Sequence, residues 1–238
     1  METTESLHSA AAGNPAPFID HTLLKASATE SEIGQLCAEA VRYGFAAVCI
    51  NPVFVRTAAR LLSGSGVKTA AVTGFPLGAS STETKVFETE KAVADGAGEI
   101  DTVISLAMAK EHRYEDIRKE IAAIRKAAPS PVILKVILEM CELSDDEKPA
   151  VCRAALEGGA DCIKTSTGFG KGGATVEDVR LMKQIADEFA AMTGKPVFVK
   201  AAGGIRDYKT AQQMIEAGAA RLGTSAGTVI YQQWEKCQ

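Results

Sequence analysis

Short apolar runs alternate with longer amphipathic stretches through almost the whole chain. Such an alternation is typical of a parallel sheet whose strands are joined by crossover helices, because both faces of the sheet are then covered. The runs are rich in Val, Ile and Ala, and we expect strands at residues 18–22, 45–50, 67–74, 99–105, 131–138, 161–165, 196–201 and 220–224. The pattern therefore predicts an α/β fold with eight strands.

Residues at both ends of the expected helices support this division of the chain. Hydroxyl residues at Thr29, Ser144 and Thr175 each stand three positions before an acidic residue, as in a capping box at a helix start. Glycines stand where helices should end, because glycine enters the left-handed C-cap conformation without strain. These glycines are Gly44, Gly96, Gly158, Gly194 and Gly218.

The length of 238 residues allows one domain or two, at about 150 residues per domain. Eight strand–helix units of roughly 27 residues each fill residues 18–238 and leave no room for a second domain. We therefore predict a single (β/α)8 TIM barrel over 18–238, preceded by a flexible N-terminal tail at 1–17. An open doubly wound sheet is the structural alternative.

Composition argues against several classes of function. The 26 basic and 30 acidic residues give a net charge of −4, which offers no positive field to nucleic acid. Six cysteines lie scattered without a CxxC pair and only three histidines are present, so no metal site is expected. The sequence shows neither a signal peptide nor a membrane-spanning segment, which predicts a cytoplasmic protein with reduced thiols and no membrane partner.

Ionisable residues interrupt strands that should be apolar. They are Asp20, Asp101, Lys135, Lys164 and Lys200. Any one of them alone would be read as a solvated residue or a structural ion pair at a strand end. Together they predict a polar cluster inside the barrel toward its C-terminal mouth, because neither the interior nor the helix layer accepts an unpaired charge cheaply.

This cluster could carry lysine chemistry. Only a neutral amine attacks a carbonyl, and lysine has an ordinary pKa of about 10.4. A second ammonium about 5 Å away would favour the neutral form by on the order of 3 kcal/mol. Lys164 and Lys200, near the ends of adjacent expected strands, could stand in that relation. Asp101 fits better as a proton carrier, because a carboxylate alone would favour the charged amine.

Two glycine-containing segments are suited to an anion. Gly203, Gly204 and Arg206 follow the seventh expected strand, and the segment with Gly223 and Ser225 follows the eighth. In phosphate-binding barrels the loops after strands seven and eight hold the phosphate, helped by a helix N-terminus. The alternative is that these glycines only form tight strand-to-helix turns.

A further glycine-rich segment, GFGKGG at 168–173, matches the dinucleotide-binding pattern G-x-G-x-x-G. It follows the sixth expected strand, and no acidic residue ending a strand near position 190 completes a ribose site. We therefore interpret it as a mobile or substrate-closing loop. For His21 and Cys49 we favour structural roles, as a hydrogen-bonding residue and a small buried side chain.

Six segments together resemble deoxyribose-phosphate aldolase. They are AAVCINPVFV (46–55), GFPLGAS (74–80), GEIDTVIS (98–105), LKVILE (134–139), CIKTSTGF (162–169) and VKAAGGIR (199–206). The resemblance implies a class I aldolase that reversibly cleaves 2-deoxy-D-ribose 5-phosphate to D-glyceraldehyde 3-phosphate and acetaldehyde. It implies sugar-phosphate and aldehyde substrates, no metal or organic cofactor, and a homodimer.

The same resemblance assigns roles by motif. Lys164 would be the Schiff-base lysine, Lys200 the lysine that lowers its pKa, and Asp101 an acid/base acting through water. Lys135 would be a further polar member of the site. Phosphate would bind at the glycine-containing segments, with Gly168 at the sixth loop.

Two other hypotheses remain open at the level of sequence. One is a Schiff-base lyase on the same barrel with a different aldehyde or ketone substrate. The other is a non-catalytic phosphate-binding barrel. Against the second stands the presence of Lys164, Lys200 and Asp101 together, because a binding protein has no need to bury two like charges.

Overall fold

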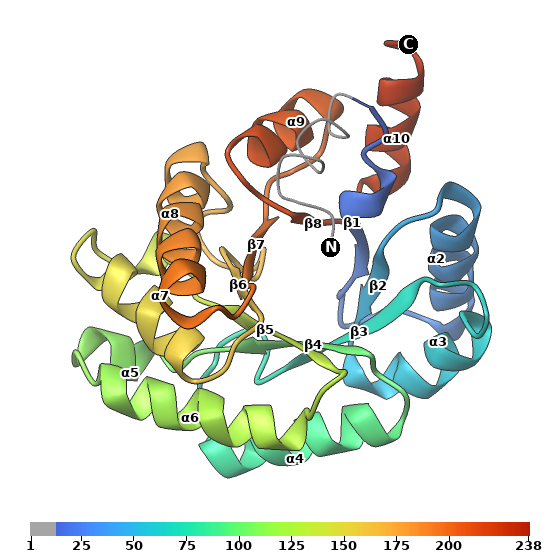
Figure 1. Cartoon of the computed structure of the whole chain (residues 1–238). Helices are drawn as coiled ribbons and strands as arrows, with labels where there is room; N and C mark the ends of the chain where they lie inside the picture. The colour runs from blue at the N-terminus through green and yellow to red at the C-terminus, as the bar shows by residue number, and fades with distance from the viewer. Residues whose placement is uncertain (1–12) are drawn as a thin grey trace.

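The computed structural model describes residues 13–238, in which eight parallel strands close into a barrel (Figure 1). Each strand pairs with the next along the chain, and β8 pairs with β1. The strands are β1 (Ile19–Leu23), β2 (Ala47–Ile50), β3 (Lys68–Thr73), β4 (Glu99–Val103), β5 (Ile133–Ile137), β6 (Cys162–Lys164), β7 (Phe198–Ala202) and β8 (Arg221–Thr224). The predicted (β/α)8 barrel is confirmed, and the closing β8–β1 pair excludes the open sheet.

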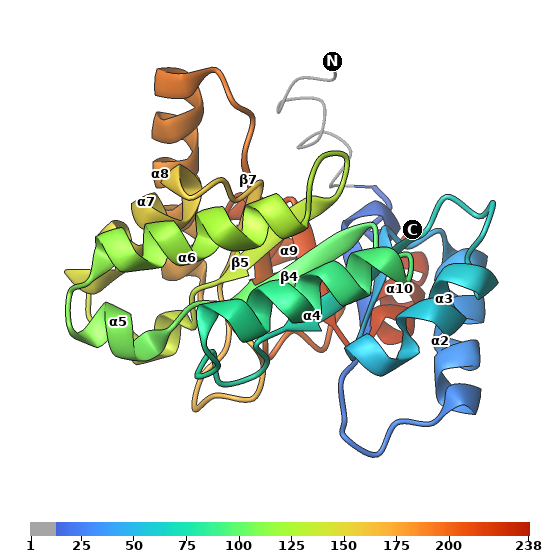
Figure 2. The ribbon, with the colours of Figure 1, turned by 90° about the horizontal axis from the view of Figure 1, so that it is seen from below.

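Helices surround the barrel as an outer layer (Figures 1 and 2). They are α2 (Glu30–Tyr43), α3 (Val55–Leu61), α4 (Thr82–Ala94), α5 (Leu106–Lys110), α6 (Tyr114–Ala127), α7 (Glu147–Glu157), α8 (Val176–Thr193), α9 (Tyr208–Glu216) and α10 (Gly227–Glu235). Short 3₁₀ turns are η1 (Ala16–Phe18), η2 (Pro52–Phe54) and η3 (Met140–Glu142). The main apolar core lies between strands and helices, where Val48, Ile100 and Leu222 point outward. Within residues 13–238, no helix is both long and apolar enough to cross a membrane.

The three expected capping motifs are present. Thr29 and Glu32 form a reciprocal capping box at α2, and the side chain of Thr175 accepts a hydrogen bond from the amide of Asp178 at α8. Ser144 and Glu147 also exchange backbone-to-side-chain bonds, but α7 begins only at Glu147. Their box therefore closes the turn before the helix and does not lie within its first turn.

Gly158 is the C-cap of α7, as expected, but the left-handed conformation expected for it is wrong. Gly158 has a helical φ of −69°, and the next residue, Gly159, carries the positive φ of 105°. Gly158 is required for packing, because a Cβ there would lie 2.7 Å from Cβ of Ile121 and 2.8 Å from the carbonyl oxygen of Arg118 on α6. Gly44 and Gly194 adopt the expected left-handed conformation.

The predicted tail, residues 1–17, falls largely outside the described range. Of its last residues, Ala16 is buried in η1, next to Phe18. The boundary between tail and barrel stays a prediction.

The interior of the barrel has two unlike sides. On β2 and β3 it is lined by small apolar side chains, those of Ala47, Cys49, Ala70 and Val72, which form a cluster separate from the main core. On β4 to β8 and on β1, charged side chains occupy the interior; they are Asp20, Glu99, Asp101, Lys135, Lys164, Lys200 and Arg221. The small residues leave the volume that the long lysine and arginine side chains fill.

Candidate active site

Lys164 ends β6 at the mouth of the barrel and is only 3% exposed. Its Nζ lies 2.8 Å from Oδ2 of Asp101, and Nζ of Lys200 lies 2.7 Å from the same oxygen. The two lysines are register partners on β6 and β7. Their nitrogens are therefore separated by no more than about twice these distances, as the like-charge argument requires.

Below this group lies a second set of ion pairs deeper in the barrel. Lys135 bonds Oδ1 of Asp101 at 2.8 Å and also pairs with Glu99. Oδ2 of Asp20 lies 2.5 Å from Nζ of Lys200. The structure thus brings together all five charged residues that the sequence singled out.

Glu99 and Arg221, which are not among the five residues that the sequence singled out, complete the network. Nε of Arg221 donates to Asp20 at 2.7 Å, and its Nη2 lies 2.9 Å from Oε2 of Glu99. A signal was present, because Glu99 precedes Asp101 by two positions on the same strand. Side chains two positions apart on a strand point to the same face.

The network contains three carboxylates and four cationic side chains. Burial alone would raise the pKa of Asp101, but its three lysine neighbours hold that pKa well below the ordinary value. Burial alone would lower the pKa of Lys200, yet the carboxylates of Asp101 and Asp20 raise it above the ordinary value. In the free site Lys200 is therefore a positive charge beside Lys164, and Asp101 is a negative charge between them.

The backbone after Lys164 is tied to β7. The hydroxyl of Thr165 donates to the carbonyl of Ala202 at 3.1 Å and accepts from the amide of Ala202 at 3.0 Å. The amide of Thr165 donates to the carbonyl of Lys200. These bonds hold the two lysine-bearing strand ends side by side.

The loop after β7 begins with two glycines in the left-handed region of the backbone. Gly203 and Gly204 have φ values of 89° and 81°. Gly203 packs closely on Gly173, because a Cβ on Gly203 would lie 3.0 Å from Cα of Gly173. The amide of Ala174 donates to the carbonyl of Gly203, so the glycine-rich segment 168–173 packs against this loop. Arg206 is exposed and makes no ion pair within residues 13–238.

At β8 the structure separates two residues that the sequence grouped together. A Cβ on Gly223 would lie 2.9 Å from Cβ of Ala202 and 3.1 Å from Cε of Lys200, so this glycine makes room for the end of β7 and for the lysine stem. Ser225 is exposed just before α10, whose N-terminus has no side-chain cap. Uncapped amides at a helix N-terminus favour an anion.

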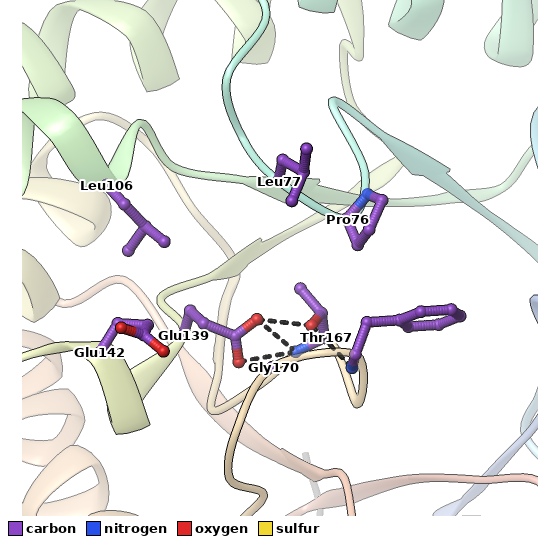
Figure 3. Close-up of a pocket in the computed structure, with 8 residues that line it drawn as sticks. Pro76, Leu77, Leu106, Glu139, Glu142, Thr167 and Gly170 are labelled. Atoms are coloured by element: carbon purple, nitrogen blue, oxygen red, sulfur yellow. Dashed lines mark hydrogen bonds between the residues drawn. The ribbon is translucent and has the colours of Figure 1, made fainter.

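A pocket of about 240 Å³ opens at the other side of the mouth, between the loops that follow β3, β4, β5 and β6 (Figure 3). The rings of Phe75 and Phe169 pack edge to face there, with their centroids 5.3 Å apart. The lining residues are Pro76, Leu77, Leu106, Glu139, Glu142, Thr167, Phe169 and Gly170.

An eight-stranded parallel barrel with ionisable side chains at the carboxyl ends of its strands defines the class of (β/α)8-barrel enzymes. Residues 16–233 match the model of the DeoC/LacD family of aldolases. The chain belongs to this family, and the resemblance noted in the sequence is confirmed.

Individual relatives agree with this assignment. The chain is 52% identical to a deoxyribose-phosphate aldolase of Caldanaerobacter subterraneus subsp. tengcongensis over 225 residues, 94% of each chain. It is 49% identical to one of Geobacillus sp. over 217 residues, 91% of this chain and 94% of the relative. The solved structure of deoxyribose phosphate aldolase from Aeropyrum pernix superposes with a TM-score of 0.87 at 30% identity, covering 100% of both chains.

Replacement of Asp101 should make the free energy of unfolding depend less on pH in the acidic range. Because the pKa of Asp101 is lowered by folding, its stabilising effect is present above the unfolded pKa of about 4 and is lost as pH falls through the folded pKa. We expect Asp101→Asn to lower the free energy of unfolding at neutral pH by about 3–5 kcal/mol, since three buried lysines lose a partner. Urea titrations should show a smaller difference below pH of about 4.

Asp145→Asn is the control, because this side chain is 99% exposed on a surface turn. It should leave stability unchanged at either pH. A deficit of Asp101→Asn that is equally large in acid would contradict the ion-pair account.

Lys200→Leu should slow imine formation at Lys164 strongly near neutral pH and less at high pH, because a fixed positive charge beside Lys164 disfavours a second ammonium. The measurement is the rate of borohydride trapping of acetaldehyde against pH. Lys209→Leu, which removes an exposed charge on α9, should match the wild type. An unchanged pH profile for Lys200→Leu would show that the like-charge argument is wrong.

Proposed function

We propose that this chain is a class I deoxyribose-phosphate aldolase. It reversibly cleaves 2-deoxy-D-ribose 5-phosphate to D-glyceraldehyde 3-phosphate and acetaldehyde through a Schiff base on Lys164. The observation that carries the proposal is one buried carboxylate, Asp101, shared by Lys164 and Lys200 at the barrel mouth. Two curated relatives that are 52% and 49% identical to this chain are named deoxyribose-phosphate aldolase.

In the cleavage direction, the neutral amine of Lys164 attacks the C1 aldehyde of the open-chain sugar. Loss of water gives an iminium, which accepts the electron pair of the C2–C3 bond when the C3 hydroxyl loses its proton. Glyceraldehyde 3-phosphate leaves, and an enamine remains on Lys164. Protonation at C2 and hydrolysis then release acetaldehyde and the free amine.

Asp101 would move the protons in this sequence, and Lys200 would supply the neighbouring positive charge. The Asp101 carboxylate lies within hydrogen-bond distance of the Lys164 amine, so it can accept a proton from it and return that proton through water. Lys135 bonds the second oxygen of Asp101 and so fixes the direction in which the carboxylate faces. A positioned carboxylate needs no reorganisation when charge develops on the imine nitrogen.

The phosphate would bind at the loops after β6, β7 and β8. Amides around Gly203 and Gly204, the exposed guanidinium of Arg206 and the N-terminus of α10 beside Ser225 are suited to it, and Gly168 borders the same loops. Gly223 would act there through the space it leaves for Lys200. Binding the phosphate away from the breaking bond fixes the sugar over Lys164.

The homodimer and the cytoplasmic location expected from the sequence stay predictions. Light scattering of the purified protein measures the first, and cell fractionation the second.

Treatment with acetaldehyde and borohydride should add one ethyl group to Lys164, because reduction makes the imine permanent. Peptide mass mapping locates the adduct. An unmodified Lys164 at saturating aldehyde would rule out the proposed chemistry. Trapping with acetaldehyde but no cleavage of deoxyribose 5-phosphate would favour a lyase for another substrate.

Arg206→Ala should raise the KM for deoxyribose 5-phosphate by about tenfold and leave the KM for unphosphorylated deoxyribose unchanged, because one charge-assisted contact to phosphate is lost. Steady-state kinetics with both sugars measure this difference. Arg60→Ala, which removes an exposed arginine from α3, should behave like the wild type. A KM that is unchanged in Arg206→Ala would remove this residue from the phosphate site.

A further inference from the structure

Glu139 has an unusual backbone conformation for its residue type. It follows β5 by two positions and has φ and ψ of 53° and 58°, in the left-handed region that favours glycine. Within residues 13–238 only His112 shares this property among non-glycine residues. Strained residues of this kind persist where the surrounding structure holds them, often at functional sites.

The side chain of Glu139 is also costly to bury. It is 4% exposed, and no basic side chain pairs with it within the described residues. Neutral donors satisfy its carboxylate, namely the amide of Thr167 at 3.2 Å and the hydroxyl of Thr167 at 2.5 Å (Figure 3). The positive φ and the buried carboxylate of Glu139 both cost free energy of folding, so a contribution to stability does not explain this residue.

What Glu139 holds is the segment directly after Lys164. Thr167 lies three residues beyond this lysine, and its hydroxyl accepts a bond from the amide of Phe169 at 3.0 Å. The backbone of the same region continues the pairing past β5, because the amide of Leu138 donates to the carbonyl of Lys164 at 2.9 Å. Glu139 therefore extends the contact between β5 and β6 into the loop above the lysine.

The opposite side of the same segment is held by Thr165, which bonds Ala202 on β7. The strand end that carries Lys164 thus lies between two fixed contacts, one toward β5 and one toward β7. Of these two contacts, only the one through Glu139 requires a strained backbone and a buried carboxylate that has no cationic partner among residues 13–238.

We propose that Glu139 is a positioning residue for the reaction at Lys164. It acts through Thr167, fixes the loop 165–169 against β5, and so sets the direction in which the Lys164 amine meets the carbonyl of the substrate. This inference rests on the proposed Schiff-base function. Misplacement of a reacting group by about 1 Å can lower a rate by on the order of 100-fold, so a loop contact can control the chemical step.

Three variants separate positioning from stability. Glu139→Ala and Glu139→Gly both remove the carboxylate, but only glycine accepts a φ of 53° without strain. We expect both to lower kcat by on the order of 10- to 100-fold with little change in KM, while Glu139→Gly is the more stable of the two in urea. Glu139→Gln retains the reach and one acceptor oxygen, and should restore kcat to within about threefold of the wild type.

The rate is expressed per Lys164 that borohydride and acetaldehyde can trap, so that unfolded protein does not contribute. Asp145→Asn, which removes an exposed carboxylate from the same β5–α7 connection, is the control and should match the wild type. The proposal is overturned if Glu139→Ala keeps its kcat per trapped site, or if Glu139→Gly regains activity together with stability. Failure of the wild type to trap acetaldehyde would instead overturn the proposed function.

Discussion

The structure depends on the carboxylate of Asp101, which three buried lysines share. A charge inside a barrel is tolerated only when it is paired, and each lysine here needs a carboxylate within reach. This requirement determines the neighbours of the site. Small residues such as Ala47 and Ala70 leave space on β2 and β3, and Gly223 on β8 leaves space for the stem of Lys200. The interior is therefore shaped around its ion pairs.

The ion pairs also separate the lysines by function. Lys135 and Lys200 are completely buried and have raised pKa values, because nearby carboxylates outweigh the effect of burial. Lys164 lies nearest the mouth, and among the described residues it pairs with Asp101 alone. Three carboxylates face four cations, so the network is neutral when one amine is uncharged. Under the proposed mechanism that amine is Lys164, and the other two lysines remain charged throughout.

Much of the architecture could be predicted from the sequence. Local signals specify the strands and most helix ends, because apolar alternation and capping residues act within a few positions of the chain. The exception at Gly158 has a tertiary cause, since its missing side chain is required by the approach of Ile121 from α6. In the site, the place of Arg221 does not follow from the sequence, because its partners, Asp20 and Glu99, are distant along the chain. The strain at Glu139 leaves no mark in the sequence, where glutamate is an ordinary residue.

By itself, the sequence determined the barrel, the charged residues on its strands and the family, because these depend on the order and spacing of residue types. Only the tertiary structure decided which of those charges meet. Closure of the barrel makes β4, β6 and β7 face one interior. Lys164 and Lys200 therefore donate to one oxygen of Asp101, although they lie 63 and 99 positions after it in the chain. It likewise decided that Gly223 serves Lys200 and that Glu139 holds Thr167. Such roles arise from distances across the barrel, which no local pattern of residues encodes.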